Sequence, residues 1–349
     1  MKKFSILLLC LLLPGSVTPP IILESALSKT VSIFAPSRPL RHIPNIAVSS
    51  DVELASEDGI TSLIIPSVPV IERALIISYD GMRPDAIAAA PMNNLLGLIN
   101  GGAYTMTNAV TIAYPSTLPS HAAMLSGLCM KQNGIIYDKY YKYMGYSKGV
   151  DIFDLAHGSG MRTVMIVGKD KLRQLAEPET TDVFEVRYDE ASIAQAAVGQ
   201  ISQGFGLMFV HFPSPDQVGH KYGWMGISYL KMLRNGDDAL GNILAELDRM
   251  GLRETTLVIV TADHGGHDKN HIGLVIEDFQ IPWIAAGTGI VPGEINASIQ
   301  TMDTAATVAY ALGWPLQPDW VGIPVYEAFG ESRLNVHPED INWPCHQWN

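Results

Sequence analysis

Ala74-Leu75-Ile76-Ile77-Ser78-Tyr79-Asp80-Gly81 is a nearly unbroken apolar run that ends in a carboxylate and a glycine. Such a run is typical of a β-strand covered on both faces. Similar runs recur along the chain between segments of helical pattern, which predicts an α/β fold built on a layered sheet. The predicted strands are Ala74–Ser78, Thr163–Val167, Leu207–His211, Leu257–Thr261 and Ile281–Ala285. The predicted long helices are Pro84–Leu98, Ser228–Met250 and Thr304–Leu312.

Composition limits the classes of function. Of the 349 residues, 47% are hydrophobic and 17% are charged, which is typical of a globular protein. The formal net charge of −12 argues against a protein that coats nucleic acid, since phosphate backbones are bound by a surplus of Lys and Arg. A small anionic substrate remains compatible with this charge if bound cations supply a local positive field.

The N-terminus, residues 1–17, has the pattern of a signal peptide. Lys2 and Lys3 precede the apolar stretch Phe4–Leu13, which is too short to span a bilayer and ends at Pro14-Gly15. A buried N-terminal helix is the alternative, but the lysine pair and the break favour a signal peptide. We therefore expect a secreted or periplasmic protein with no later membrane span.

The rest of the chain is expected to form three parts. Residues 18–70 are predicted to be an irregular N-terminal extension packed on the domain, residues 71–330 the main domain, and residues 331–349 a C-terminal tail. Cys129 and Cys345 are candidates for a disulfide that would attach the tail, or for two free thiols.

Polar residues follow the predicted strands where each strand ends. Asp80 follows the first strand, His211–Asp216 the third and Asp263-His264 the fourth. Because ligands bind at the carboxyl ends of strands in open α/β sheets, we expect a site there. For Asp80 alone, capping of the helix that Pro84 opens is the alternative.

Thr117 lies between Pro115 and Pro119, just before the helical stretch Ala122–Leu125. It is therefore predicted near a helix N-terminus, where free N–H groups and the helix dipole favour an anion or an alkoxide. An ordinary helix cap is the alternative. A hydroxyl is a poor nucleophile near neutral pH unless a base or a metal lowers its pKa, so a nucleophile here requires a partner.

Two segments carry Asp and His at the spacing of metal ligands. Asp216 and His220 flank a glycine in a predicted proline-rich loop, where a hydrogen-bonded pair without a metal is the alternative. The segment after the fourth strand contains Asp263, His264, His267, Asp268 and His271, which is difficult to explain by core packing.

Together these segments supply enough ligands for two cations. Such a pair, about 3.5–4 Å apart, can stabilise the attacking and leaving oxygens of an in-line phosphoryl transfer. One cation would lower the pKa of the Thr117 hydroxyl, and the other would bind the leaving oxygen and then supply hydroxide. These residues indicate a small phosphorylated substrate.

The order of these motifs resembles the alkaline phosphatase superfamily, and within it the type I phosphodiesterase/nucleotide pyrophosphatase family. The resemblance runs from about Ile71 to Ala328. It implies a three-layer α/β/α sandwich with a mixed central sheet, and hydrolysis of phosphodiester or pyrophosphate bonds through a phosphorylated Thr117. It also implies two zinc ions, one held by Asp80, Thr117, Asp263 and His264, and the other by Asp216, His220 and His271. His267 is the rival of His271 for the last position.

The sequence departs from the family pattern at Asp138, where such diesterases carry an asparagine that donates to a phosphoryl oxygen. An ionised Asp138 cannot donate and would repel phosphate. Its pKa is raised, a neighbouring cation masks it, or it points elsewhere. A catalytically inactive, metal-binding relative is the corresponding alternative function.

Lys169 and Lys171 resemble a stretch of the related phosphonoacetate hydrolases, in which lysines bind the anionic groups of the substrate. If both reach the site, they favour a phosphomonoester or a phosphonate over a diester. A solvated loop is the alternative. A sulfatase is disfavoured, since that branch needs a Cys or Ser where Thr117 stands.

Overall fold

The computed structural model describes residues 55–57, 60–62, 70–273 and 275–332. The expected signal peptide lies outside these residues, as do almost all of the expected extension and tail. Within the extension, which was expected to be irregular, β1 (Ala55–Glu57) pairs with β2 (Ile60–Ser62) in a short antiparallel hairpin.

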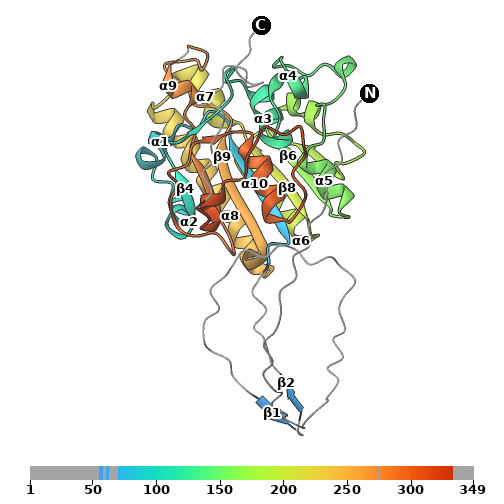
Figure 1. The fold of residues 1–349 in the computed structure, drawn as a ribbon. Helices are drawn as coiled ribbons and strands as arrows, with labels where there is room; N and C mark the ends of the chain where they lie inside the picture. The colour runs from blue at the N-terminus through green and yellow to red at the C-terminus, as the bar shows by residue number, and fades with distance from the viewer. Residues whose placement is uncertain (1–54, 58–59, 63–69, 274, 333–349) are drawn as a thin grey trace, which may run out of the picture. The chain divides into compact units, whose positions relative to one another are not determined.

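An eight-stranded mixed sheet forms the centre of the main domain (Figure 1). Its parallel part has β3 in the middle, with β9 on one side and β8, β6 and β7 on the other; β10 is antiparallel to β9 and to β4, and β11 completes the edge. Their bounds are β3 Arg73–Tyr79, β4 Ala103–Thr105, β6 Thr163–Val167, β7 Val183–Val186, β8 Leu207–Phe212, β9 Thr256–Ala262, β10 Trp283–Ala286 and β11 Gly293–Glu294.

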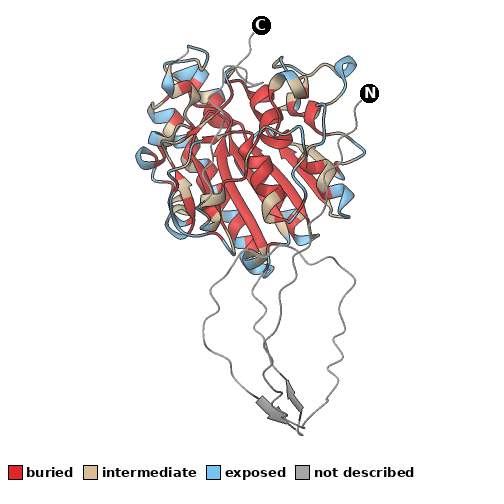
Figure 2. Cartoon of the chain, viewed as in Figure 1, coloured by how far each residue is buried: buried red, intermediate tan, exposed pale blue. Residues whose placement is uncertain are grey.

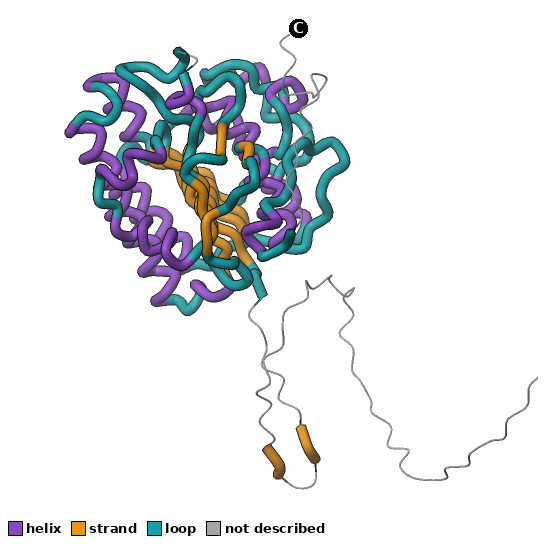
Figure 3. Tube along the Cα trace, turned by 60° about the vertical axis from the view of Figure 1, so that its left-hand side comes forward, coloured by secondary structure: helices purple, strands orange, loops and turns teal. Residues whose placement is uncertain are grey.

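Helices cover both faces of the sheet, which confirms the expected three-layer sandwich (Figure 3). Adjacent residues of β3 point to opposite faces, as a strand requires. Ser78 Oγ lies 2.8 Å from His121 on α3, whereas the Tyr79 hydroxyl donates to Gly236 on α8 at 2.9 Å. One layer holds α8 packed against α1, α2, α6 and α7, and the other holds α10 packed against α3 and α5.

The helices have the following bounds: α1 Pro84–Ala89, α2 Asn93–Gly101, α3 Thr117–Ser126, α4 Met130–Asn133, α5 Ile152–Gly158, α6 Glu190–Ser202, α7 Ser214–Tyr222, α8 Ile227–Arg249, α9 Ile276–Phe279 and α10 Asp303–Ala311. Short 3-10 helices cover Lys142–Met144, Asp170–Leu175 (η2), Arg253–Thr255 and Tyr326–Phe329. A separate parallel pair joins β5 (Ala109–Val110) to β12 (Ile299–Gln300).

The core lies along the central strands, where β6, β8 and β9 are buried at every position (Figure 2). This explains their continuous apolar runs. All five predicted strands are present, with bounds that differ by no more than two residues at either end.

Two predictions about helices are wrong. The single helix expected over Pro84–Leu98 is two helices, because Pro91 lacks a backbone N–H and separates α1 from α2. Asp216 and His220 were expected in a loop but lie on α7, four residues apart and therefore on one helix face.

Among the described residues, no helix combines the length and the apolar character that crossing a bilayer requires. Cys129 is buried and disulfide-bonded. Cys345, the candidate partner, lies outside the described residues.

Candidate active site

The candidate site lies at the carboxyl ends of the central parallel strands, as expected from the chain order. Asp80 follows β3, while Asp263 and His264 follow β9. Asp216 is on α7, which begins two residues after β8 ends. Thr117 is the first residue of α3, so the nucleophile predicted from the sequence does stand at a helix N-terminus.

Asp80, Asp263 and His264 form the first group of metal-type ligands, and all three are fully buried. His264 Nε2 is 3.5 Å from Asp80 Oδ1 and 3.4 Å from Asp263 Oδ2. None of these three atoms has a hydrogen-bond partner. A buried polar atom without a partner costs free energy unless a ligand satisfies it, so this group fits a metal ion.

Asp216, His220 and His271 form the second group. Asp216 Oδ1 is 3.3 Å from His220 Nε2 and 3.8 Å from His271 Nε2, and it too is buried without a hydrogen-bond partner. His220 is more open, with 45% of its side chain exposed. The two groups adjoin, since the rings of His264 and His271 stack 3.9 Å apart.

The three candidate histidine ligands share one arrangement. The Nδ1 of His220, His264 and His271 meets a backbone carbonyl, that of Lys269 at 2.9 Å, of Gly265 at 2.8 Å and of Pro115 at 2.6 Å. Nδ1 must therefore carry the proton, and the lone pair is left on Nε2, toward the aspartates. Metal-binding histidines are commonly oriented by such a second hydrogen bond.

His267, the rival of His271, lies in neither group. Its Nδ1 is 2.7 Å from Oδ1 of the fully buried Asp278, whose Oδ2 accepts from Gly273 N at 2.7 Å. His267 therefore helps to fix the loop that presents His271. Asp268, from the same Asp- and His-rich segment, lies in neither group either.

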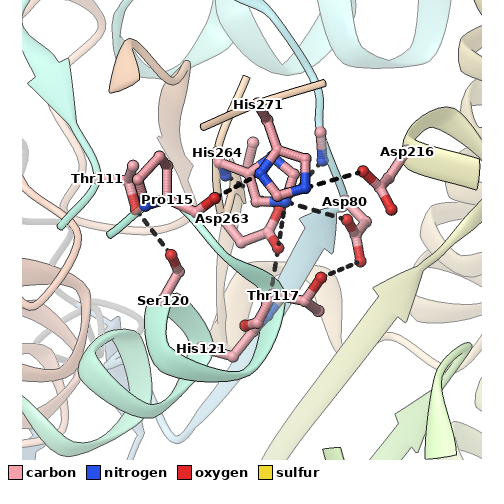
Figure 4. A network of polar contacts seen from close by, with 12 residues as sticks. Asp80, Thr111, Pro115, Thr117, Ser120, His121, Asp216, Asp263, His264 and His271 are labelled. Carbon is pink, nitrogen blue, oxygen red and sulfur yellow. Dashed lines mark hydrogen bonds and ion pairs between the residues drawn. The ribbon is translucent and has the colours of Figure 1, made fainter. Parts of the chain in front are cut away.

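Thr117 lies beside the first group (Figure 4). Its Oγ1 is 3.4 Å from Asp80 Oδ2, and its side chain is almost fully buried. A second hydroxyl of α3, that of Ser120, instead pairs with Thr111 at 3.1 Å.

Lys169 enters the centre of the site. Its Nζ is 2.7 Å from Asp80 Oδ2, 2.6 Å from Asp216 Oδ2 and 3.1 Å from Thr117 Oγ1. The solvated-loop alternative is therefore wrong for this residue. One ammonium joins both ligand groups and the hydroxyl, and it leaves the Oδ1 atoms of both aspartates facing the histidines.

Asp138 and Lys171 form an ion pair next to the start of α3. Lys171 Nζ is 2.7 Å from Asp138 Oδ2, and Asp138 Oδ1 accepts from Leu118 N at 2.9 Å. The sequence left three possibilities for Asp138: a raised pKa, a neighbouring cation or a side chain that points elsewhere. The structure shows the second of these, and the cation is Lys171.

The electrostatics follow from burial and these contacts. Burial and the Asp80 carboxylate raise the pKa of Asp263 to about 7. Burial also acts to raise the pKa of Asp80, but Lys169 and His211 hold it well below its usual range. Burial lowers the pKa of His271 to about 4, so its imidazole is neutral at pH 7 and free to bind a metal.

Two histidines that were not among the predicted ligands or catalytic residues support the site. His211 Nε2 donates to Asp80 Oδ2 at 2.8 Å, since its Nδ1 accepts from Gly168 N at 3.1 Å. His121 Nδ1 donates to the Thr117 carbonyl at 2.7 Å and fixes the first turn of α3. The position of His211 at the end of a predicted strand was the signal available for it.

The family model for type I phosphodiesterase/nucleotide pyrophosphatase matches residues 74–154 and 166–280, which include all the candidate ligands and Thr117. The chain belongs to this family.

Curated proteins of this phosphodiesterase family are similar to the chain over about half of its length. The bis(5'-adenosyl)-triphosphatase ENPP4 of Mus musculus is 23% identical over 214 residues, which cover 55% of this chain and 47% of the mouse protein. The ectonucleotide pyrophosphatase/phosphodiesterase family member 7 of Homo sapiens is 23% identical over 220 residues, with 55% and 47% covered. The chain thus spans about half the length of these relatives.

Solved structures share the fold. Murine ectonucleotide pyrophosphatase/phosphodiesterase 5 aligns with a TM-score of 0.61 at 13% identity, covering 74% of this chain and 99% of that one. A 2-O glycosaminoglycan sulfatase, BT1596, aligns with a TM-score of 0.62 at 18% identity, covering 76% of each chain. At these identities the likeness establishes the alkaline phosphatase-like fold alone.

Proposed function

We propose that this family member is a two-metal phosphoric ester hydrolase that acts through a phosphorylated Thr117. The observation that carries the proposal is the set of unpartnered buried atoms, Asp80 Oδ1, Asp263 Oδ2, His264 Nε2 and Asp216 Oδ1, which converge beside a hydroxyl at a helix N-terminus. Four such atoms in one place are best explained by bound cations.

The ligand sets fit zinc, which prefers imidazole nitrogen and carboxylate oxygen. Asp80, Asp263, His264 and Thr117 would hold one ion, and Asp216, His220 and His271 the other. When bound, the two ions would supply charge to the attacking and leaving oxygens and a hydroxide at neutral pH.

The residues of the chain perform the remaining steps. The Lys169 ammonium, 3.1 Å from Thr117 Oγ1, favours the alkoxide after the hydroxyl proton has left to solvent. Thr117 Oγ1 then forms a bond to phosphorus while the bond from phosphorus to the leaving oxygen breaks. Water cleaves the resulting Oγ1–phosphorus bond, which releases phosphate or a phosphomonoester and restores the hydroxyl.

Phosphodiester or pyrophosphate bonds are the first proposed substrate class. The family supports this, as does the name of the mouse relative, a bis(5'-adenosyl)-triphosphatase. Murine ectonucleotide pyrophosphatase/phosphodiesterase 5 is described as inactive after a threonine-to-alanine change and as a complex with AMP. That description supports a threonine nucleophile here.

Phosphomonoester or phosphonate cleavage is the second candidate, favoured by Lys169. Once cations neutralise Asp80 and Asp216, the Lys169 ammonium would be released from both carboxylates and available to a doubly charged phosphoryl group. The lysine adds one positive charge to the site, which a dianion uses better than a monoanionic diester.

We also propose that residues 1–17 direct the protein to a secreted or periplasmic location. The basic and apolar pattern of this segment supports the proposal. The test is N-terminal sequencing of the protein exported by its host, which should begin after the apolar stretch.

The test of this function uses the full chain and begins with a measurement of its zinc content. The turnover of three substrates is then compared: bis-p-nitrophenyl phosphate, p-nitrophenyl phosphate and phosphonoacetate. Thr117→Ala should lower kcat by at least roughly a thousandfold, because the attacking atom is gone. Ser120→Ala is the matched control, since that hydroxyl of the same helix pairs with Thr111. Near-full turnover by Thr117→Ala would rule out the covalent route, and bound zinc without any turnover would identify an inactive relative.

A further inference from the structure

Three glycines of the site lie against one indole ring, that of Trp224. Each belongs to a segment that carries a candidate ligand: Gly81 follows Asp80, Gly219 precedes His220, and Gly266 comes two residues after His264. A Cβ atom at Gly81, Gly219 or Gly266 would lie 3.3, 2.7 or 2.2 Å, respectively, from a carbon of the indole. The ring therefore approaches the backbone of both ligand groups, because Asp80 and His264 belong to the first group and His220 to the second.

The space that Trp224 fills explains why two of these positions are glycine. Gly219, within α7, and Gly266 both lack a positive φ, so their backbone would accept a residue with a side chain. The three atoms nearest to a Cβ at either position all belong to the indole. Glycine is therefore required there because the ring comes so close to the backbone. Gly81 differs, since its φ of +71° favours glycine by itself.

The indole is fixed in this position by burial and by two hydrogen bonds. Trp224 is 7% exposed. Its Nε1 donates to the Gly81 carbonyl at 2.9 Å, and its backbone N–H donates to the Asp268 carbonyl at 2.8 Å. The N–H of Gly81 donates in turn to Asp263 Oδ1 at 3.0 Å, which leaves Oδ2 of this ligand without a partner. Trp224 thus holds the turn that orients a ligand of the first group.

The same ring meets both histidines of the second group. Its centroid is 5.2 Å from that of His220, with an interplanar angle of 82°, and 6.2 Å from that of His271, at 70°. Both are edge-to-face contacts, which aromatic rings prefer. The hydrogen bond to Asp268 also holds the segment that leads to His271. One side chain therefore contacts the segments that carry both ligand groups.

We propose that Trp224 is a positioning residue that sets the spacing of the two ligand groups and thereby their affinity for both cations. The inference rests on the proposed metal sites. Zinc binds nitrogen and oxygen ligands at about 2.0–2.2 Å, so ligands on separate segments must be placed accurately before the ion arrives. Trp224 supplies no ligand itself; it acts through the backbone of the glycines and the rings of the histidines.

The first test compares zinc affinities, measured by competition with a chromophoric chelator at a temperature at which thermal unfolding shows each full-length variant to be folded. Trp224→Leu should weaken zinc binding at both sites by about 10- to 100-fold, since the residue supports the ligands of both. Trp224→Phe, which keeps a ring but loses the donor to Gly81, should show a smaller loss and serves if the leucine variant does not fold.

Trp314→Leu is the matched control for this comparison. Trp314 is 8% exposed, follows α10 and packs in the core. Its replacement should lower the midpoint of thermal unfolding, because a large buried side chain is lost. Zinc affinity should stay within about twofold of the wild type, which separates a loss of stability from a loss of ligand placement.

The second test uses the contact between Gly266 and the indole. Gly266→Ala should weaken zinc binding by at least about tenfold in the wild type, because the added methyl group displaces the ring. In the Trp224→Leu background, where the fused rings are gone, the same substitution should change the affinity by no more than about twofold. Gly199→Ala, on α6 with no atom within 4 Å of the new Cβ, is the control and should leave zinc affinity unchanged in both backgrounds.

Zinc affinity within about twofold of the wild type in Trp224→Leu would overturn the inference, as would an equal effect of Gly266→Ala in both backgrounds. A failure of the proposed function has a different signature. Zinc binding with the expected order of affinities, but no turnover of any phosphoester, would retain the positioning role and remove the enzyme. An active, zinc-loaded enzyme whose zinc affinity ignores Trp224 would do the opposite.

Discussion

At the scale of single residues, the buried contacts of Asp80 link several parts of the site. One of its oxygens meets His211 and Lys169, which leaves the other facing His264. The direction of the free oxygen therefore depends on residues that would not touch the metal.

His211→Phe should lower zinc affinity by about 10- to 100-fold, because the donor that orients Asp80 is lost while a ring of similar size remains. Competition with a chromophoric chelator measures the affinity. His157→Phe, at an exposed position of α5, is the control and should leave the affinity unchanged. Equal zinc affinities of His211→Phe and the wild type would mean that Asp80 keeps its orientation without the hydrogen bond from this histidine.

The residue types in the site could be predicted from the sequence, but several of their contacts could not. Asp, His and Thr residues at the ends of predicted strands indicated a metal centre, and the structure brings them together. The bridge that Lys169 makes between Asp80 and Asp216 joins three separate segments of the chain. Local pattern contains no information on such a contact.

At the scale of elements, the residues at the two ends of α3 determine where this helix begins and stops. It begins at Thr117 and is closed by Gly127, which adopts a left-handed φ of +68°. A Cβ at Gly127 would lie 2.7 Å from the Trp320 ring. The position therefore requires glycine for both its backbone conformation and its space.

Gly127→Ala should lower the free energy of unfolding by about 1–3 kcal/mol, from left-handed strain and the contact with Trp320. Urea unfolding monitored by circular dichroism gives this value. Gly158→Ala in the last turn of α5 is the control, since a Cβ there meets no atom within 4 Å. It should be neutral or stabilising by up to roughly 1 kcal/mol. An equal loss of unfolding free energy in both variants would show that the left-handed conformation of Gly127 and its contact with Trp320 are not the cause of the loss.

Elements were predictable where burial alone sets the pattern. The central strands are covered on both faces, so their apolar runs were sufficient to identify them. Short edge strands such as β7 and β11 have no fully buried position and gave no such signal. The helix that carries Asp216 and His220 was missed because Pro215 near its start suggested a loop, although proline is tolerated in a first turn.

At the scale of the whole molecule, the candidate ligands join segments from residue 80 to residue 271. Three buried aspartates meet there, with Lys169 as the adjoining cation. Asp80 and Asp216 share the single Lys169 cation, and the raised pKa of Asp263 shows that further negative charge is costly there, so cations that bind only the folded chain must stabilise the site.

Removal of metal by EDTA should lower the midpoint of thermal unfolding by roughly 5 °C or more. A site at hundredfold ligand excess contributes about 2.7 kcal/mol, and about 1 kcal/mol shifts the midpoint of a domain this large by a few degrees. Differential scanning calorimetry with and without zinc measures the change. In Asp80→Asn the shift on adding zinc should be smaller, and an equal shift in both proteins would place the stabilising ion elsewhere.

The unequal exposure of the two ligand groups has a consequence for how the metal-loaded protein is prepared. The first group is sealed from solvent, whereas His220 opens the second group to it. Dialysis should therefore strip the two proposed ions in sequence, the outer one before the inner. A sample with one equivalent of zinc would be a uniform half-loaded species and not a mixture of full and empty chains. Such a species would retain the ion beside Thr117 and lack the one proposed to assist departure of the leaving group.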